Sequence, residues 1–300
     1  EAFNIEGFGK KIVENFWNLN LIKLPQDIFK LDFKKIENLD GWGKQSVANL
    51  KYSSMSLEEL QRLPAHNGVI NFKITETSFL MLNILNDDSS VVKYFWKDEH
   101  DLKSLNLWYD ISKENGTFID VGAHTGLYTL TSIKANNDNN VVSFEPYFMN
   151  MARLITNLRL NGATKNVTII LGAASNFSGK TKFNITSEKS YLSKGGKIDN
   201  TGSDVNVYSI DDIYVDKLNK PLNGIKIDTE GEDYKVLIGC EKLINLYKPK
   251  IIIEVREDNK LEIKLFLKKY KYKFFDVLDL ENEIDLEDII INNMANIFAK

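Results

Sequence analysis

The stretch from Gly116 to Thr131, GTFIDVGAHTGLYTLT, constrains the fold more than any other part of the chain. A short apolar run ending at Val121 is followed at once by Gly122 and Gly126, and then by the apolar-periodic start of a helix. This order predicts a strand, a tight turn and a helix, because glycines let a turn backbone approach a ligand closely. Asp120 falls at the carboxyl end of the strand, where open α/β sheets bind their ligands.

The loop pattern D-x-G-x-x-x-G differs from the G-x-G-x-x-G of dinucleotide-binding enzymes. Without a pyrophosphate fingerprint, a ligand with a positive centre and hydroxyl groups, such as S-adenosylmethionine, suits the loop better than NAD. Two alternatives stay open. Gly122 and Gly126 serve only the turn, since glycine is the usual turn residue, or the chain is an NAD-dependent oxidoreductase that lacks the usual fingerprint.

Composition excludes several classes of protein. The chain has 300 residues, 43% hydrophobic and 27% charged, with a formal net charge of −4, so no broad nucleic-acid surface is expected. The single cysteine, Cys240, cannot form an intrachain disulfide and indicates a reducing, cytoplasmic location. Lys10 and Lys11 interrupt the N-terminal apolar residues and no run approaches about 20 apolar residues, so neither signal peptide nor membrane span is expected.

The chain is predicted to have three parts, residues 1–52, 53–115 and 116–300. The middle part has strand character at residues 68–74 and 79–84 and is interpreted as a lid or N-terminal extension of the catalytic domain. From Gly116 onward strands and helices alternate, which predicts an α/β fold with a doubly wound, mostly parallel sheet. The later strands are expected at residues 141–144, 167–171, 225–227, 251–255, 273–277 and 293–298, and the helices at residues 151–160, 237–246 and 261–270.

Two further segments of this region carry expectations. Residues 175–209 are predicted to be a long loop, and long loops are often functional. Around the helix 151–160, five apolar residues recur at helical spacing and are expected in the core: Phe148, Met149, Leu154, Ile155 and Leu158. Asn157 and Asn161 can reach the site from that helix, but Asn161 precedes Gly162 and is better explained as a helix cap.

Glu145 ends the second strand of this region, 25 residues after Asp120. An acid at that place can accept hydrogen bonds from both ribose hydroxyls of an adenosine cofactor, because the first two strands are neighbours in this winding. Pro146 then fixes the turn. A solvated loop acid is the alternative for Glu145 taken alone.

Asp228, Glu230 and Glu232 follow the strand 225–227 and are expected beside the methyl group of such a cofactor. Methyl transfer needs alignment of the acceptor and removal of its proton, and a carboxylate whose pKa is raised by neighbouring acids can take that proton. Alternatively, Glu230 and Glu232 only populate a first helical turn, where acids suit the helix dipole. Glu254, at the end of the strand 251–255, is a candidate to orient the substrate or, with Asp228, to hold a divalent metal, but two acids are too few to predict a metal.

Four motifs in this order resemble the FkbM-type methyltransferase family over about residues 68–298: DVGAHTGLY from Asp120, FEP from Phe144, IKIDTEGE from Ile225 and IIIE from Ile251. The resemblance implies a class I methyltransferase, Rossmann-like fold, S-adenosylmethionine as cofactor, and O-methylation of a hydroxyl on a sugar or small natural product. It implies a cofactor site formed by Asp120, Gly122, Ala123, His124, Gly126, Glu145, Pro146 and Ala173. It also implies catalytic roles for Asp228 and Glu230, and substrate contacts for Glu232 and Glu254. His124 departs from the family, in which Asn is common.

Residues 1–52 contain a repeat at an offset of 34, in which IEGFGKKIVENF from Ile5 aligns with LDGWGKQSVANL from Leu39. Each copy reads as a hairpin and a helix and resembles the all-α helix-hairpin-helix modules of bacterial NAD-dependent DNA ligases, whose hairpins bind DNA phosphate. Residues 1–50 hold seven Lys, no Arg and seven acids, which disfavours strong phosphate binding. No K-x-D-G motif of a ligase is present. The segment is therefore either a DNA-binding module or the remnant of a gene fusion.

Overall fold

The computed structural model describes residues 10–23, 31–39, 42, 47, 59, 67–74, 76–97, 102–185, 192, 195–199, 201–289 and 295–300. The chain forms two compact units. The first unit is Glu1–Ile70 with Asn83–His100, and the second unit is Asn71–Leu82 with Asp101–Lys300. The predicted part boundaries at residues 52 and 115 stay a prediction.

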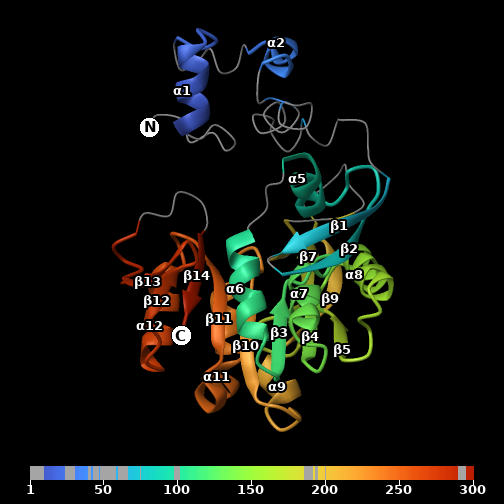
Figure 1. Cartoon of the computed structure of the whole chain (residues 1–300). Helices are drawn as coiled ribbons and strands as arrows, with labels where there is room; N and C mark the ends of the chain where they lie inside the picture. Colours follow the sequence, from blue (N-terminus) through green and yellow to red (C-terminus); the bar gives the residue numbers. More distant parts are fainter. Residues whose placement is uncertain are drawn as a thin grey trace. The chain divides into compact units, whose positions relative to one another are not determined.

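An eight-stranded sheet forms the centre of the second unit, in the order β13-β12-β14-β11-β10-β3-β4-β5 (Figure 1). The strands are β3 (Thr117–Val121), β4 (Asn140–Glu145), β5 (Val167–Leu171), β10 (Leu222–Ile227), β11 (Lys250–Val255), β12 (Phe274–Asp276), β13 (Asp279–Ile284) and β14 (Ala295–Ala299). The five strands from β11 to β5 are parallel, whereas β14 runs antiparallel between β11 and β12. The chain winds outward in both directions from β3 and β10. The predicted doubly wound, mostly parallel sheet is therefore confirmed.

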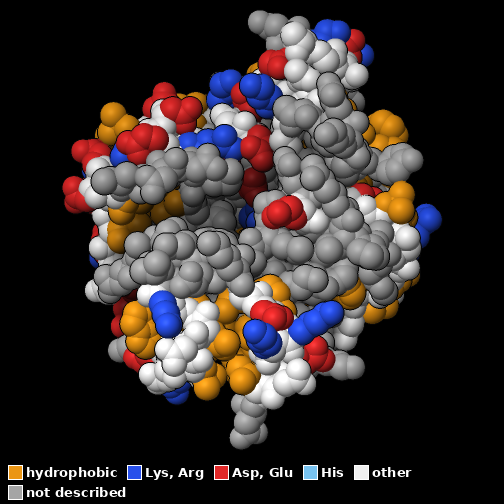
Figure 2. All heavy atoms as spheres, turned by 90° about the horizontal axis from the view of Figure 1, so that it is seen from above, with side chains coloured by type: hydrophobic (Ala, Val, Ile, Leu, Met, Phe, Trp, Pro, Cys, Tyr) orange, Lys and Arg blue, Asp and Glu red, His pale blue; other side chains and the backbone are white. Residues whose placement is uncertain are grey.

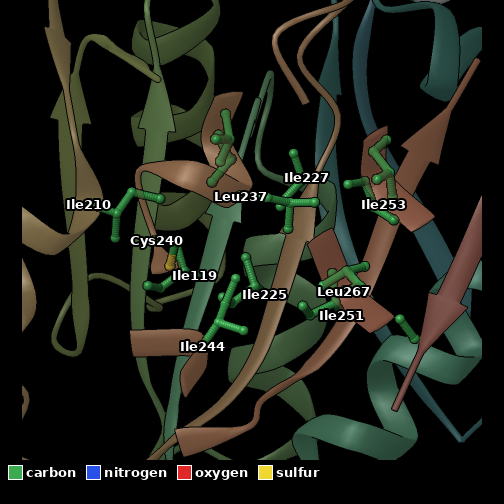
Figure 3. Packing of buried hydrophobic residues seen from close by; sticks show 14 of the residues in the cluster. Ile119, Ile210, Ile225, Ile227, Leu237, Cys240, Ile244, Ile251, Ile253 and Leu267 are labelled. Atoms are coloured by element: carbon green, nitrogen blue, oxygen red, sulfur yellow. The ribbon is translucent and has the colours of Figure 1, made fainter. Parts of the chain in front are cut away.

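Helices cover both faces of this sheet. They are α6 (Leu102–Ser112), α7 (Leu127–Ala135), α8 (Phe148–Leu160), α9 (Ile210–Tyr214), α10 (Asp233–Ile238), α11 (Glu241–Tyr247) and α12 (Lys260–Lys269). On one face, the ring of Trp108 in α6 meets the ring of Phe118 in β3 edge to face. On the other face, a buried apolar cluster joins β3, β10 and β11 to α10, α11 and α12. Figure 3 shows its members Ile119, Ile225, Ile227, Ile251, Ile253, Leu237, Ile244 and Leu267.

Because side chains alternate along a strand, β10 contributes apolar side chains to one face of the sheet and Lys226 to the other. Ile225 and Ile227 of β10 are fully buried in the apolar cluster, so Lys226 between them points to the opposite face. The register pairs Lys226 with Asp120 of the neighbouring strand β3. Asp120 in turn lies opposite Ser143 of β4. A polar row thus crosses the sheet on the α7 face, at the carboxyl ends of the strands.

The prediction of a long loop at residues 175–209 is wrong. This segment contains β7 (Gly179–Asn184), β8 (Lys197–Asp199) and β9 (Ser203–Tyr208), which form a second sheet in the order β6-β9-β7-β8 with β6 (Ala173–Ala174). Half of the positions of β7 and of β9 are exposed, and each strand buries one residue, Phe183 and Val207 respectively. The apolar alternation was therefore too weak to predict strands, although backbone pairing stabilises them.

The helix predicted at residues 237–246 is two helices, α10 and α11, separated at Gly239 and Cys240. A Cβ on Gly239 would lie 2.0 Å from the carbonyl oxygen of Ser175. This contact comes from a distant part of the chain and has no local signal. The strand β13, exposed along most of its length, was not predicted either.

In the first unit, the described helices are α1 (Lys10–Asn18), α2 (Phe33–Glu37) and α5 (Ser89–Lys97). The helix α1 confirms the helix expected in the first copy of the repeat. Asp32 caps α2 by accepting hydrogen bonds from the backbone of Lys34 and Lys35. A small buried core joins α1 and α2, and it consists of Phe16, Ile22, Leu31, Ile36 and Val47. The hairpin glycines at 7, 9, 41 and 43, and the histidines at 66 and 100, lie outside the described residues.

Two strands, β1 (Gly68–Ile74) and β2 (Thr77–Asn83), form a separate two-stranded sheet. They match the strands expected at residues 68–74 and 79–84. Their alternate residues are buried, and the rings of Phe72 and Phe79 stack at a centroid distance of 5.5 Å.

Candidate functional site

The glycine loop between β3 and α7 has three residues in left-handed backbone conformations. Gly122, His124 and Gly126 have φ values of +78°, +49° and +94°. A Cβ on Gly122 would lie 1.8 Å from the carbonyl oxygen of Asp228, so the carboxyl ends of β3 and β10 approach too closely for any other residue. The close packing of the two strand ends is sufficient to require Gly122. This glycine by itself therefore also agrees with the alternative in which it serves only the turn. The backbone N–H groups of Gly122 and Ala123 both donate to the carbonyl of Phe144 at 3.0 Å.

Glu145 ends β4 beside this loop and is 4% exposed. Its Oε2 accepts a hydrogen bond from the backbone N–H of His124 at 2.8 Å. Its Oε1 accepts from the backbone N–H of Tyr147 at 2.9 Å and from Nδ2 of Asn150 at 3.2 Å. Burial raises the pKa of Glu145 to about 7, against the opposing effect of these donors and of Lys226. Glu145 is thus a buried, oriented carboxylate and not the solvated loop acid of the alternative.

Lys226 is the centre of the polar row across the sheet. Its Nζ lies 3.1 Å from Oδ2 of Asp228, 3.4 Å from the carbonyl oxygen of Gly122 and 4.9 Å from the ring centroid of Tyr128. Burial lowers the pKa of Lys226, but the charges of Asp228 and Asp120 outweigh burial and raise it. A lysine with such partners stays charged although it is buried.

Asp120 is fully buried in the same row. Its Oδ2 accepts a hydrogen bond from the hydroxyl of Thr129 at 2.7 Å, whereas its Oδ1 has no hydrogen-bond partner. Burial raises the pKa of Asp120, and the charge of Lys226 opposes this effect. An unpartnered buried carboxylate oxygen next to a glycine loop suits a site that binds a polar or cationic ligand.

The acidic residues after β10 form a tight turn, closed by Asp233. The carboxylate of Asp233 accepts hydrogen bonds from the backbone N–H and hydroxyl of Thr229, each at 3.0 Å, and from the backbone N–H of Gly231 at 3.2 Å. Glu230 has a φ of +55° in this turn. Glu232, two residues after Glu230, is the N-cap of α10, and its carboxylate accepts a hydrogen bond from the hydroxyl of Ser175 at 3.0 Å and pairs with Nζ of Lys235 at 2.7 Å.

Arg256 joins two of the predicted carboxylates. Its Nη2 lies 2.5 Å from Oε2 of Glu230 and 2.9 Å from Oε2 of Glu254. Burial raises the pKa of Glu254 to about 7, helped by the charge of Asp228 and opposed by Arg256. The structure therefore brings Asp228, Glu230 and Glu254 together at the carboxyl ends of β10 and β11, whereas Glu232 is engaged by other partners.

A cavity of about 330 Å³ begins directly after Glu145. Its walls come from the residues after β4, from the end of β5 and from β7 and β9, namely Pro146, Tyr147, Phe148, Leu171, Lys180, Phe183, Ile185, Ser203, Asp204, Val205 and Asn206. Phe148 is 59% exposed, so its predicted place in the core is wrong. It is the first residue of α8, and its side chain lines this cavity, whereas Asn150 in the same turn is buried. Ala173 is buried in β6, two residues beyond Leu171.

Four site residues were not predicted: Lys226, Arg256, Asp233 and Tyr128. For Lys226 a local signal existed, since a lysine between two isoleucines in a buried strand requires a charged partner. Arg256 was missed because one of its two partners, Glu230, comes from the turn after β10, although the other, Glu254, lies only two residues before it. On the face seen in Figure 2, Lys and Arg side chains lie among Asp and Glu side chains.

Neither a cluster of metal-ligating side chains nor a membrane-spanning helix occurs in the described part of the chain. Among these residues, no group of three or more His, Cys, Asp or Glu side chains is arranged to hold a metal ion. None of the described helices has the length and apolar character needed to cross a bilayer.

Comparison with known proteins identifies relatives of both parts of the chain. The family described as "Methyltransferase FkbM domain" matches residues 120–274. DNA ligase of Pelagibacter ubique is 34% identical over 172 residues, which are 57% of this chain and 22% of the ligase. DNA ligase of Rickettsia bellii is 51% identical over 55 residues, 16% of this chain and 8% of the ligase. The chain thus spans only a small part of these ligases.

A crystal structure of methyltransferase FkbM from Methylobacillus flagellatus is 16% identical to this chain, with a TM-score of 0.44, and the match covers 90% of this chain and 62% of that chain. The two resemblances read from the sequence, to the FkbM family and to the ligase segment ahead of it, are confirmed by the family match and the ligase relatives.

Proposed function

Because the chain belongs to the FkbM methyltransferase family, we propose that its second unit transfers a methyl group from S-adenosylmethionine to a hydroxyl of a sugar or small natural product. The cofactor supplies an electrophilic methyl group on a positively charged sulfur. The residues of the chain have to hold the cofactor, align the acceptor and take the acceptor proton.

The Glu145 carboxylate is the observation that carries this proposal. Three donors from the glycine loop and the start of α8 fix its orientation, and they use three of the roughly four acceptor positions of a carboxylate. The remaining capacity on Oε2 suits a ribose hydroxyl. A buried carboxylate aligned by backbone donors fits a neutral hydroxyl ligand better than a phosphate, which its charge would repel.

The cavity next to Glu145 supports an adenosine ligand as well. Its walls start at Pro146 and Tyr147, the two residues after the ribose carboxylate, and include the rings of Phe148 and Phe183. Aromatic and aliphatic walls with a few polar groups are typical of sites that bind planar bases. We therefore assign this cavity to the adenine ring, with Ala173 at the nearby end of the small sheet.

On the acceptor side, we propose that Asp228 takes the proton of the hydroxyl. Its carboxyl is 40% exposed, and its bond to Lys226 fixes its position at the end of β10. Glu230 is held by the guanidinium of Arg256, which makes its carboxylate the weaker candidate for a base. Glu254 and Glu232 lie nearby as groups that orient the acceptor, and the glycine loop, from Asp120 to Gly126, adjoins the cofactor.

Isothermal titration calorimetry of the full chain with S-adenosylhomocysteine tests the cofactor assignment. We expect wild-type protein to bind with a micromolar dissociation constant and Glu145→Gln to bind at least about tenfold more weakly, as for a lost charged hydrogen bond. The matched control is Glu262→Gln, an exposed acid on α12, which should bind like wild type. Failure of wild type to bind either S-adenosylhomocysteine or S-adenosylmethionine would overturn the proposal.

The acceptor class needs a separate experiment. The full chain is incubated with methyl-labelled S-adenosylmethionine and a panel of sugars, phenols and aliphatic alcohols, with amines as the comparison. We expect the labelled methyl group on an oxygen of the acceptor. Asp228→Asn should abolish most of the methyl transfer while leaving the affinity for S-adenosylhomocysteine unchanged. Label that appears only on the amines would contradict O-methylation.

A second proposal concerns DNA. The 51% identity of a 55-residue segment to a DNA ligase favours residues 1–52 as a ligase-derived module that binds duplex DNA. Its balanced charge limits the counterion release that drives such binding. Fluorescence anisotropy of the full chain with labelled duplex should therefore detect weak binding at low salt that disappears at physiological salt. If the chain does not bind duplex DNA at low salt, residues 1–52 are better interpreted as the remnant of a gene fusion.

A further inference from the structure

Two side chains of α8, those of Arg153 and Asn157, and the side chain of its C-cap residue, Asn161, hydrogen-bond the backbone of strand β2. Oδ1 of Asn161 accepts from the N–H of Leu80 at 2.8 Å, and its Nδ2 donates to the carbonyl of Leu80 at 2.7 Å. Oδ1 of Asn157 accepts from the N–H of Leu82 at 2.9 Å, and Nη1 of Arg153 donates to the carbonyl of Leu82 at 2.9 Å. The helix side chains thus bind this strand as a neighbouring strand would.

The spacing of these residues explains the match. Arg153, Asn157 and Asn161 are four residues apart, so their side chains follow one face of the helix with a rise of about 6 Å each. Leu80 and Leu82 are two residues apart in a strand, a rise of about 6.7 Å. The spacing along the helix is nearly equal to the spacing along the strand. Successive side chains on this face of the helix therefore meet successive inward-facing backbone amides of β2.

Asn157 differs from Asn161 in one respect, because it also reaches the glycine loop. Its Nδ2 donates to the carbonyl oxygen of Thr125 at 2.8 Å, and both residues are almost completely buried. Thr125 lies between His124, whose N–H holds Glu145, and Gly126, the N-cap of α7. Nδ2 of Asn161 instead donates to Leu80 and to the carbonyl of Asn157 within its own helix.

We propose that Asn157 is a positioning residue for the cofactor loop and that it couples the docking of strand β2 to cofactor binding. This inference rests on the proposed function in one respect, namely that the loop binds S-adenosylmethionine. The side-chain amide of Asn157 hydrogen-bonds both the loop and the strand. Loss of its Nδ2 group would free the loop, because the buried carbonyl of Thr125 would lose this donor. Because coupling is reciprocal, cofactor bound to the loop favours the docked strand.

The test compares two isosteric variants of the full chain, Asn157→Asp and Asn161→Asp. Each keeps the oxygen that accepts from β2 and loses the Nδ2 donor, but only Asn157→Asp loses the bond to the loop. We expect Asn157→Asp to weaken S-adenosylhomocysteine binding in calorimetry by about tenfold, and Asn161→Asp to change it by less than about twofold.

A second measurement is independent of the cofactor. Hydrogen–deuterium exchange of the ligand-free chain should be faster in peptides covering residues 122–130 for Asn157→Asp and unchanged there for Asn161→Asp. Both variants should exchange faster in residues 77–82. In wild type, S-adenosylhomocysteine should slow exchange in residues 77–82 as well as in the loop, and Asn157→Asp should lose this effect on the strand.

The outcomes separate the two proposals. If wild type fails to bind S-adenosylhomocysteine, the proposed function is wrong, and loop exchange still decides whether Asn157 positions the loop. If wild type binds and the two variants behave alike in affinity and loop exchange, the positioning role is wrong. Should Asn157→Asp be unfolded at the assay temperature, the uncharged pair Asn157→Ala and Asn161→Ala gives the same comparison.

Discussion

The carboxyl group of Glu145 is moved out of water by folding, so its protonation depends on the fold. Its pKa of about 7 in the folded protein exceeds its usual value of 4.5. The folded state therefore binds more protons than the unfolded state between these values. The contribution of this proton uptake to the free energy of unfolding is complete below about pH 4.5 and is lost as the pH rises through about 7.

Glu145→Gln removes this titration and should change the pH dependence of stability. Relative to the variant, wild type should lose on the order of 3 kcal/mol of unfolding free energy between pH 5 and pH 8. Urea unfolding of both proteins at the two pH values measures the difference, and the similar titration of Glu254 cancels because both proteins contain it. Parallel pH profiles would show that Glu145 has an ordinary pKa.

Gly122 and Gly162 have similar left-handed backbones but different surroundings. Gly122→Ala combines a φ of +78° with a Cβ 1.8 Å from the Asp228 carbonyl, whereas Gly162 has a φ of +61° and open space. We expect Gly162→Ala to cost about 1 kcal/mol of unfolding free energy from backbone strain alone, and Gly122→Ala to cost at least about 3 kcal/mol. Urea unfolding measures both values, and equal costs would contradict the close contact of β3 with β10.

At the scale of single elements, α12 is stabilised by one buried face. Leu267 is fully buried in the apolar cluster, and Leu265 on the same helix is 62% exposed. Leu267→Ala should lower the unfolding free energy by about 2–5 kcal/mol, because it leaves a cavity in the apolar cluster. Leu265→Ala should change it by less than about 0.5 kcal/mol. Similar effects of the two substitutions would mean that α12 does not pack as described.

The turn after β10 and the end of β11 are joined by Arg256. Arg256→Leu leaves Glu254, 6% exposed, without its guanidinium partner. We expect a loss of about 3 kcal/mol at pH 8, where Glu254 is ionised, and a clearly smaller loss at pH 5, where it takes a proton. Lys269→Met, which breaks an exposed pair with Glu241, is the control and should cost less than about 1 kcal/mol at either pH. A loss that does not depend on pH would argue against the raised pKa of Glu254.

For the whole molecule, all proposed cofactor residues belong to the second unit. S-adenosylhomocysteine at 100 times its dissociation constant should therefore stabilise that unit by about 2.7 kcal/mol. Hydrogen–deuterium exchange of the full chain should slow in peptides from residues 117–135 and stay unchanged in residues 10–23 of the first unit. Equal protection of both peptides would show that the cofactor stabilises the first unit as well.

The sequence alone was sufficient for features that depend on neighbours in the chain. Apolar runs predicted β3, β4, β5, β10 and β11 to within a few residues, because each of these parallel strands contains a short apolar run. The glycine loop was also visible, since Gly122 and Gly126 lie between the apolar run and the helix, and glycine is the usual turn residue. Glu145 and Asp228 were found as candidates because strand ends carry the ligand sites of this fold.

Tertiary structure decided everything that depends on contacts between distant segments. The small sheet and β13 escaped prediction because exposed strands gain stability from backbone pairing and bury few side chains. Phe148 follows the helical pattern of its neighbours, but it is 59% exposed and lines the cavity instead of the core. Lys226, Arg256 and Asn157 each have partners from distant segments, namely the carbonyl of Gly122, the carboxylate of Glu230, and the backbone of Leu82 and Thr125. Hydrophobic periodicity specifies which residues are buried, whereas hydrogen bonds and ion pairs depend on the final register and packing, which only the folded chain provides.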